Sequence, residues 1–506
     1  MRSAPSPAHE LVRTLWQALR SLGAEPTPLQ IETWGLAVHS ALASKSRQFH
    51  SHEHVMELCE GASPLEVVAA IYHDLVYVQV DGELPAAVRA LLEPLLERTE
   101  GASFRVLPRA ADNPLTAQVL AIFGRNVGDV MGPFCGLNEL ASAWVLVMHL
   151  GETLPTDQLV ELAACIEATI PFRLDPGASL ATRLADLGWS QLDTKRAVEQ
   201  AVRFANRDVD NFSDPDAARF LANTWKLLPE TNPSLHVPSR YTVGDYRVAL
   251  LKMETFLEKL DPARVFHAWG DEPSPEEHAR LIAAAGENIR IAVRYLRVKL
   301  YAIALIEAIC LASGGDLPLQ YVMGAIASRG EKSRLESFLP IALRSPRVEE
   351  GDALPRLLAG GRAGSSSFDI APSPLASYLL TALGEPAICE AVAAARSFWA
   401  GEKTPLEFLR AQEGSIVSAL ASAAAELAET RRESLANVLA ELSLSFGQAV
   451  DLADDGAPAS GVASQWPAAP RQTQKFRRLD WSNDALAMYN VPEPDVRDIT
   501  NKLSAG

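Results

Sequence analysis

Apolar residues recur three and four positions apart along almost the whole chain, and this spacing restricts the fold more than any other feature. The series Leu11, Leu15 and Leu19 is one example. A helix repeats every 3.6 residues, so this spacing gathers apolar side chains on one helical face, whereas a strand requires strict alternation. Such alternation is hard to find in this sequence. We therefore predict an all-α fold.

The length of the chain and one shift in composition predict how it is divided. Its 506 residues exceed the ~250–300 at which a single core stops growing. A stretch rich in Gly, Ser and Pro at 341–374 lacks helical periodicity and is typical of a linker or exposed loop. We expect a helical domain with a helical extension over 1–340, a helical hairpin or bundle over 375–450, and a flexible tail over 451–506.

Charge and cysteine content exclude several classes of function. The net charge of −17 opposes attraction to phosphate backbones, so bulk nucleic-acid binding is disfavoured. The five cysteines form no CxxC pair, which argues against a disulfide framework or a thiolate zinc site; we expect them to be core residues. No run approaches the ~20 apolar residues that cross a bilayer. We therefore expect a cytoplasmic protein with no membrane partner.

Histidines cluster near the N-terminus, in the segment 47–77. This segment holds His50, His52, His54 and His73, four of the ten histidines, and Asp74 follows the last of them. Two antiparallel helices joined by a short turn would bring the start of the first helix close to the end of the second. That arrangement places His54 beside the pair His73 and Asp74. Imidazole and carboxylate groups together suit a first-row divalent metal.

The same segment resembles the HD superfamily of metal-dependent phosphohydrolases. The resemblance is to a subgroup in which R-x-Y-H-N-x-x-H-I is followed by F-H-D-x-V-Y. The matching residues are Arg47, Phe49, His50, His54, Val55, Tyr72, His73, Asp74, Val76 and Tyr77. The chain has Phe49 where the pattern has Tyr, and Ser51 where it has Asn. The resemblance implies a multi-helix core and a divalent metal, either Mn, Fe, Mg or Zn, held by His54, His73 and Asp74.

Members of that superfamily complete the metal site with one more aspartate far downstream. The segment RFANRDVDNFS offers Asp208 in the best-matching place, and Asp210 is the second choice. Asp129 and Asp186 are competitors for the same role. If the segment is helical, residues 208 and 210 point about 200° apart, so only one of them can face the metal.

Phosphate requires cationic partners, and four basic residues are candidates. Arg47, Arg173 and Lys226 are the expected substrate-binding residues, and Arg207 is expected to act on the phosphate beside Asp208. An arginine fork matches phosphate oxygens in a bidentate fashion.

Two further residues are candidates for proton transfer. His50 would bind a second metal or protonate the leaving group. Glu139 would accept a proton or hold a metal-bound water; the alternative is a polar residue that faces solvent on its helix.

These residues together predict a metal-dependent phosphohydrolase that cleaves a phosphomonoester or phosphodiester, with a nucleotide as the expected small-molecule substrate. A divalent metal would lower the pKa of a bound water and polarise the phosphoryl oxygen. Two alternatives stay open: a non-catalytic ligand-sensing or scaffold protein that retains an HD core, and an HD-type di-iron oxygenase. Metal content and release of phosphate from generic esters distinguish them.

Overall fold

The computed structural model describes residues 6–189, 192–232, 235, 241–323, 334–339, 352–366 and 368–447. These residues form two compact units. The first unit consists of the described residues within 1–236 and 255–290. The second unit consists of the described residues within 237–254 and 291–482. The predicted flexible tail over 451–506 lies outside the described residues.

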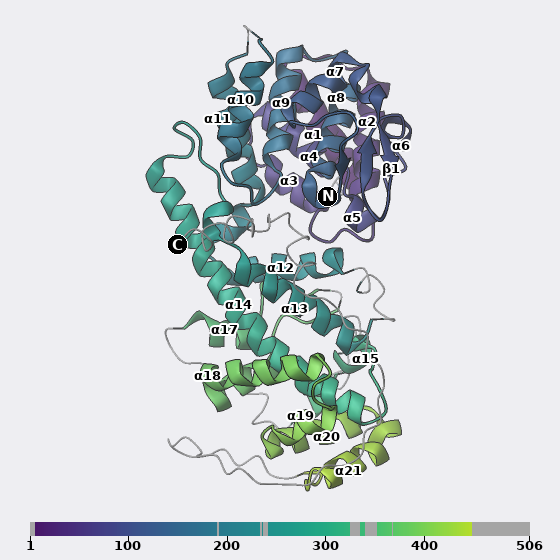
Figure 1. Ribbon diagram of the computed structural model, residues 1–506, viewed down its shortest axis with the longest axis vertical. Coiled ribbons are helices and arrows are strands. Elements are labelled where there is room, and N and C mark those ends of the chain that lie inside the picture. Colours follow the sequence, from purple (N-terminus) through teal and green to yellow (C-terminus); the bar gives the residue numbers. More distant parts are fainter. Residues whose placement is uncertain are drawn as a thin grey trace, which may run out of the picture. The chain divides into compact units, whose positions relative to one another are not determined.

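Helices make up most of the described chain, as predicted (Figure 1). The helices of the first unit are α1 (Pro7–Ser21), α2 (Pro28–Leu42), α3 (His52–Cys59), α4 (Pro64–His73), α5 (Val78–Asp81), α6 (Arg89–Leu92), α7 (Pro114–Ile122), α8 (Leu137–Leu150), α9 (Thr156–Ala168), α10 (Pro176–Asp186), α11 (Thr194–Asp208) and α12 (Ala217–Thr231), with short 3-10 turns η1 (Pro108–Ala111), η2 (Pro133–Cys135), η3 (Asp210–Ser213) and η5 (Pro262–Arg264). Two long helices, α13 (Val243–Lys259) and α14 (Pro275–Ala312), contribute residues to both units.

The remaining helices belong to the second unit. They are α15 (Leu319–Met323), α17 (Ala353–Gly360), α18 (Pro374–Trp399), α19 (Pro405–Arg410), α20 (Gly414–Leu427) and α21 (Arg432–Glu441), with turns η6 (Leu335–Phe338) and η7 (Glu429–Arg431). The predicted helices over 375–450 are thus present in the described part, in a unit that also includes much of α14.

The described part also contains one small antiparallel sheet. Its order is β1 (Leu96–Arg98), β2 (Phe104–Val106) and β3 (Val130–Met131), with Leu96 opposite Val106 and Phe104 opposite Met131. Strands of two or three residues are too short to produce an alternating pattern that stands out in a sequence.

Helix α4 lies at the centre of the first unit and positions the histidine cluster. Its sequence PLEVVAAIYH is apolar on all sides, and every residue from Leu65 to His73 is buried. Such a helix is stable only when neighbours surround it, and α1, α3, α8 and α9 do so. A capping box closes its start, because Ser63 and Glu66 each accept a hydrogen bond from the other's backbone N–H.

The region predicted as a linker over 341–374 differs from that expectation where it is described. It contains α17, which packs on α18, and Asp369, which is only 1% exposed. The Asp369 carboxylate accepts a hydrogen bond from Tyr246 Oη at 2.6 Å and lies 3.1 Å from Lys299 Nζ and 3.4 Å from Arg362 Nη1. We name Asp369, Lys299 and Arg362 the buried ion cluster.

The buried ion cluster explains why a segment rich in Gly and Ser is ordered. Phe368, next to Asp369 in the chain, packs against the rings of Tyr241 and Tyr246. A buried carboxylate that has lost its water needs charged partners to offset desolvation. Burial by itself would raise the pKa of Asp369, but the positive charges of Lys299 and Arg362 outweigh this effect and hold the pKa below its usual value. The spacing of apolar residues does not predict a buried ion pair between residues far apart in the chain.

Helix α18 is the one described helix whose length and composition would allow it to cross a membrane. Its backbone leaves helical geometry at Gly384, with φ +74°, and Pro386 follows. One helix of this kind is weak evidence, because core helices of other proteins have the same composition.

No disulfide joins any of the five cysteines, as predicted. Cys165 and Cys310 are buried, whereas Cys389 is exposed, so the expectation of a core position is wrong for Cys389. It lies in the second half of α18 and faces outward there.

A partly buried histidine in the first unit predicts how stability depends on pH. His149 Nδ1 lies 3.1 Å from Tyr72 Oη, its ring stacks on Trp34, and burial lowers the pKa of His149 to about 4. The unfolded chain takes up a proton at this residue near pH 6.5, whereas the folded chain does so only near pH 4. We therefore expect His149 to reduce stability as pH falls from 6.5 to 4, by up to about 1.4 kcal/mol per pH unit.

This contribution can be measured by urea unfolding across pH 4–7. Between pH 4 and 6.5, the slope of the free energy of unfolding against pH should be smaller in His149→Gln than in the parent. The difference should correspond to close to one proton taken up on unfolding. Identical slopes for parent and variant would contradict the prediction.

Candidate metal centre and adjoining pocket

Three of the predicted metal ligands converge closely on one point. The Nε2 atoms of His54 and His73 lie 3.1 and 3.3 Å from Asp208 Oδ1, and the three residues offer ligand atoms that all lie within 4.8 Å of one another. Ligand atoms around an ion at ~2.1 Å are separated by roughly 3–3.5 Å. The spacing of this group therefore suits a single divalent ion.

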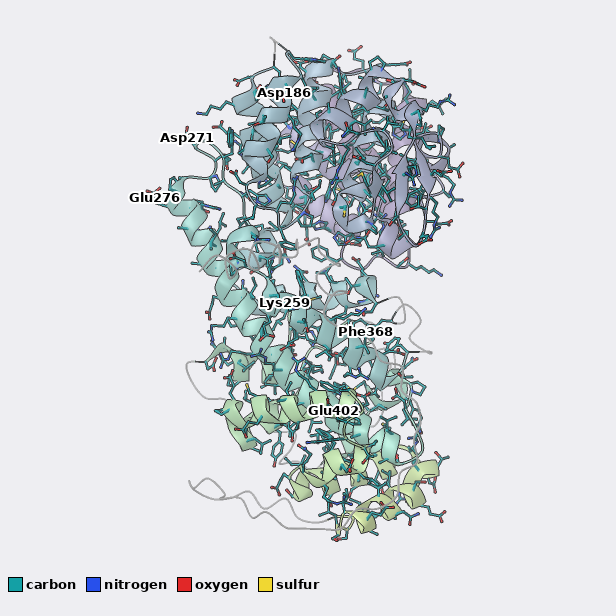
Figure 2. All side chains as sticks on the ribbon, viewed as in Figure 1. Asp186, Lys259, Asp271, Glu276, Phe368 and Glu402 are labelled. Carbon is teal, nitrogen blue, oxygen red and sulfur yellow. The ribbon has the colours of Figure 1, made fainter. Side chains whose placement is uncertain are left out.

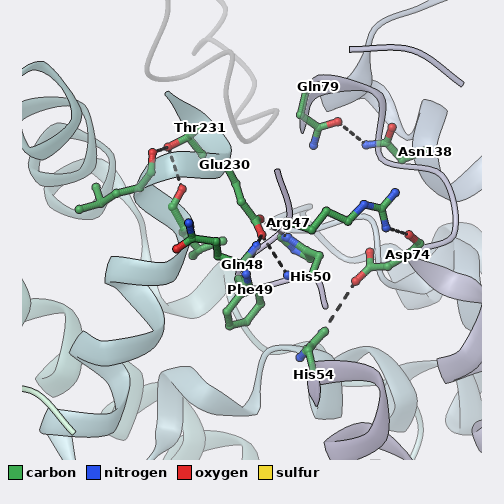
Figure 3. A network of polar contacts seen from close by, with 12 residues as sticks. Arg47, Gln48, Phe49, His50, His54, Asp74, Gln79, Asn138, Glu230 and Thr231 are labelled. Atoms are coloured by element: carbon green, nitrogen blue, oxygen red, sulfur yellow. Dashed lines mark hydrogen bonds and ion pairs between the residues drawn. The ribbon is translucent and has the colours of Figure 1, made fainter. Parts of the chain in front are cut away.

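Asp74, the fourth predicted ligand, lies at the edge of this group. Its Oδ2 is 3.0 Å from His73 Nε2 and 3.9 Å from His54 Nε2, and Figure 3 shows His54 facing Asp74. Burial opposes ionisation, yet the charges of His73 and His50 hold the pKa of Asp74 well below its usual value. Both Asp74 Oδ2 and His73 Nε2 are buried without a hydrogen-bond partner, which fits atoms that serve as metal ligands.

Helix ends bring these four residues together. His54 lies in the first turn of α3, His73 ends α4, Asp74 caps α4, and Asp208 ends α11. The C-terminal end of a helix carries partial negative charge and favours a cation. The expected antiparallel pair of helices joined by a short turn is confirmed by α3 and α4, which pack on each other.

The tautomer of His73 is set by the backbone. Its Nδ1 lies 2.8 Å from the carbonyl oxygen of Ala70, which can only accept a hydrogen bond. Nδ1 therefore carries the proton, and Nε2 faces the cluster as the atom available for a metal. A hydrogen bond of this kind from the second ring nitrogen is what orients histidine ligands in metal sites.

The competing aspartates lie elsewhere. Asp210 is exposed and accepts a hydrogen bond from Ser213 within η3. Asp129 accepts one from the backbone of Asn126 in a turn, and Asp186 lies on the surface at the end of α10 (Figure 2). Among the four candidates, Asp208 alone joins the group.

A pocket of about 200 Å³ opens beside the cluster in the first unit. Asp74, Asp208, His50 and Glu139 belong to its wall. Aromatic side chains form much of the remainder, namely Phe49, Tyr77, Phe172, Phe212 and Phe256. Two of the predicted proton-transfer residues therefore lie at the predicted metal ligands.

Glu139 is a buried carboxyl group in this wall. It lies in the first turn of α8, and its Oε2 is buried with no hydrogen-bond partner. Burial raises the pKa of Glu139 to about 7, with a smaller contribution from the negative charges of Asp74 and Asp208. The expectation that it interacts with the site fits this position better than the alternative of a solvent-facing residue.

His50 is held by a residue that the sequence did not indicate, Glu230 of α12. Glu230 Oε2 lies 2.5 Å from His50 Nδ1, and Glu230 Oε1 accepts hydrogen bonds from the backbone of Gln48, Phe49 and His50 (Figure 3). Burial lowers the pKa of His50, but the charges of Glu230 and Asp74 outweigh it and raise that pKa. No sequence spacing connects Glu230 to residues that precede it by 180 positions.

Arg47 does not face the pocket as a substrate-binding residue would. Its side chain is fully buried, pairs with Asp81 at 2.6 Å and donates to the carbonyl oxygens of Asp74 and Leu75. Carbonyl groups at the end of a helix have no partner within the helix. The Arg47 guanidinium thus provides hydrogen-bond donors for the carbonyl oxygens at the end of α4, and it holds the backbone of Asp74 in place.

The three other predicted phosphate-binding cations are also absent from the pocket wall. Arg173 donates two hydrogen bonds to the buried Glu167 carboxylate, which also pairs with Arg183, and two to the backbone carbonyl oxygens of Glu167 and Ile170. Arg207 donates to the carbonyl oxygen of Glu60, since adjacent helical residues point about 100° apart and Asp208 takes the direction of the cluster. Lys226 is exposed on α12.

No protein-family model, curated protein or solved structure matches the chain.

Proposed function

We propose that this protein is a divalent-metal-dependent phosphohydrolase of the HD type. The observation that carries the proposal is the convergence of His54, His73 and Asp208, with Asp74 at their edge, beside a pocket. These four residues come from the ends of three helices, and Asp208 follows His54 by 154 positions, so a chance meeting of two imidazoles and two carboxylates is a poor explanation. We expect the protein to act in the cytoplasm.

His54, His73, Asp74 and Asp208 would hold the ion, which could be Mn, Fe, Mg or Zn. When bound, it supplies an activated water and polarises a phosphoryl oxygen. Glu139 is placed to take the proton of the attacking water at Oε2, because this atom is buried, unpartnered and part of the pocket wall. His50, whose pKa is raised by the charge of Glu230, would donate a proton to the leaving oxygen.

Phosphate release from p-nitrophenyl phosphate and its bis-ester tests the proposal. The full chain would be stripped of metal, then assayed alone and with Mn²⁺, Fe²⁺, Mg²⁺ or Zn²⁺. We expect activity only with metal, and a loss of kcat of about 10²-fold or more in Glu139→Gln with metal binding retained. Absence of hydrolysis of both esters by fully metal-loaded protein would overturn the proposal.

A di-iron oxygenase is the second candidate. It is favoured by the lack of Lys and Arg among the described residues that line the pocket, because an oxygenase substrate need not carry phosphate. Oxygen consumption by the Fe²⁺-loaded protein, with no phosphate release from either ester, would favour this candidate.

A further inference from the structure

We propose that the pocket accepts a monoester with a single phosphoryl group and an uncharged, mainly apolar alcohol portion, and that it discriminates against nucleoside polyphosphates. This inference rests on the proposed function for its phosphoryl group, and it replaces the nucleotide that the sequence led us to expect. Three observations support this ligand class: the charge balance of the pocket wall, the partners of the nearby cations, and the apolar character of the remaining wall.

The charge of the wall cannot accommodate a polyphosphate. The described lining contains the carboxylates Asp74, Glu139, Asp208 and Glu230, and His50 is the one side chain of that lining able to carry positive charge. A divalent ion would be balanced by Asp74 and Asp208. Each further phosphate group would enter a negatively charged site without a cationic partner, and burial of an unpaired anion is strongly unfavourable.

The two arginines close to the pocket, Arg173 and Arg47, already form hydrogen bonds with other groups of the fold. The charge of Arg173 acts on Glu139, yet four N–H groups of Arg173 are bonded to Glu167 and Ile170. Arg47 donates hydrogen bonds to the Asp81 carboxylate and to two backbone carbonyl oxygens. Releasing Arg47 would leave Asp81, whose side chain is 11% exposed, without this counter-charge. Releasing Arg173 would break its four hydrogen bonds and leave Arg183 as the partner of the buried Glu167 carboxylate.

The rest of the wall suits an apolar group. Phe172 packs against Phe212 and Phe256, with ring centroids 6.0 and 5.6 Å away. The backbone of Phe172 has φ +58°, a strained conformation for a bulky residue. Strain of this kind persists only where the surroundings hold it, and it is frequent at ligand sites. The wall thus holds an aromatic ring at the cost of backbone strain.

A few uncharged polar side chains interrupt this apolar wall, namely Gln79, Asn138, Thr169, Asn211 and Thr231. A largely apolar pocket with a small number of polar groups is the usual form of a small-molecule site, where the polar groups orient the ligand.

Binding of stable phosphonates to the Mn²⁺-loaded full chain tests this inference without any catalytic step. Calorimetry would compare phenylphosphonate, methylphosphonate and a non-hydrolysable ATP analogue, with Mn²⁺ in excess so that the analogue does not strip the site. We expect phenylphosphonate to bind about tenfold or more tightly than either of the others.

Variants separate the contribution of the wall from that of the fold. Phe212→Leu should reduce the preference for phenylphosphonate over methylphosphonate, whereas Phe104→Leu, the same change in β2, should leave it intact. Thr231→Lys adds a cation to the wall and should raise affinity for the ATP analogue. Melting temperatures would confirm that each variant is folded.

The outcomes distinguish this inference from the proposed function. Tighter binding of the ATP analogue than of phenylphosphonate by the parent protein would overturn the inference and leave phosphohydrolysis standing. Failure of all three ligands to bind the metal-loaded protein would also overturn it. The expected preference without ester hydrolysis would support the ligand class and refute the phosphohydrolase.

Discussion

Asp208→Asn is expected to weaken Mn²⁺ binding by more than about 100-fold, whereas Asp210→Asn should change it by less than about twofold. The first substitution keeps the shape of a side chain whose Oδ1 lies 3.1 and 3.3 Å from two histidine nitrogens, but it removes the charge that offsets the ion. The second alters an exposed residue whose carboxylate bonds within its own turn. The two variants therefore form a matched pair, two positions apart.

Competition with a chelating indicator would give the two metal affinities, and circular dichroism would verify that helix content is unchanged. Hydrolysis should fall in parallel with metal occupancy in the Asp208 variant. Equal and mild effects in the two variants would mean that neither aspartate is a ligand.

Asp369→Asn should destabilise the second unit by about 3–5 kcal/mol. The substitution leaves Lys299 and Arg362, which are 2% and 3% exposed, buried without the carboxylate that they share. Glu426→Gln is the control in the same unit, because Glu426 pairs with Arg432 on the surface, where such pairs contribute roughly 0–1 kcal/mol. Denaturant unfolding of the full chain, followed at several wavelengths, would compare them.

An apolar replacement of the whole buried ion cluster sharpens this test. A triple variant, Asp369→Leu with Lys299→Met and Arg362→Met, removes all three charges together and should recover most of the loss. If the triple variant is as unstable as Asp369→Asn, the penalty arises from packing or from the Tyr246 hydrogen bond and not from unpaired charge.

Short-range patterns were enough to predict most of the helices and the approach of His54 to His73 and Asp74. The spacing of apolar residues is a local property, so it predicted α3, α4 and the turn between them, and this turn brings His54 to His73 and Asp74. The choice of Asp208 came from the resemblance to the HD superfamily, and the geometry agrees with it.

Charged side chains were harder to assign, because a cation near a site in sequence has many partners available in space. Arg47, Arg173 and Arg207 were expected at phosphate, yet each bonds to a carboxylate or carbonyl group of the fold. The interior of a protein penalises an unpaired charge heavily, so buried carboxylates such as Glu167 take the nearest arginine. Sequence spacing carries no information on that competition.

The sequence by itself determined the helical class, the position of the histidine pair and the absence of a disulfide framework, all of which follow from residue type and local spacing. The tertiary structure alone decided that Glu230 holds His50, that Asp369 is buried in the supposed linker, and that the described pocket wall lacks Lys and Arg. These three features depend on residues far apart in the chain. Long-range pairing arises from burial and desolvation in the folded chain, and a periodic pattern does not encode it.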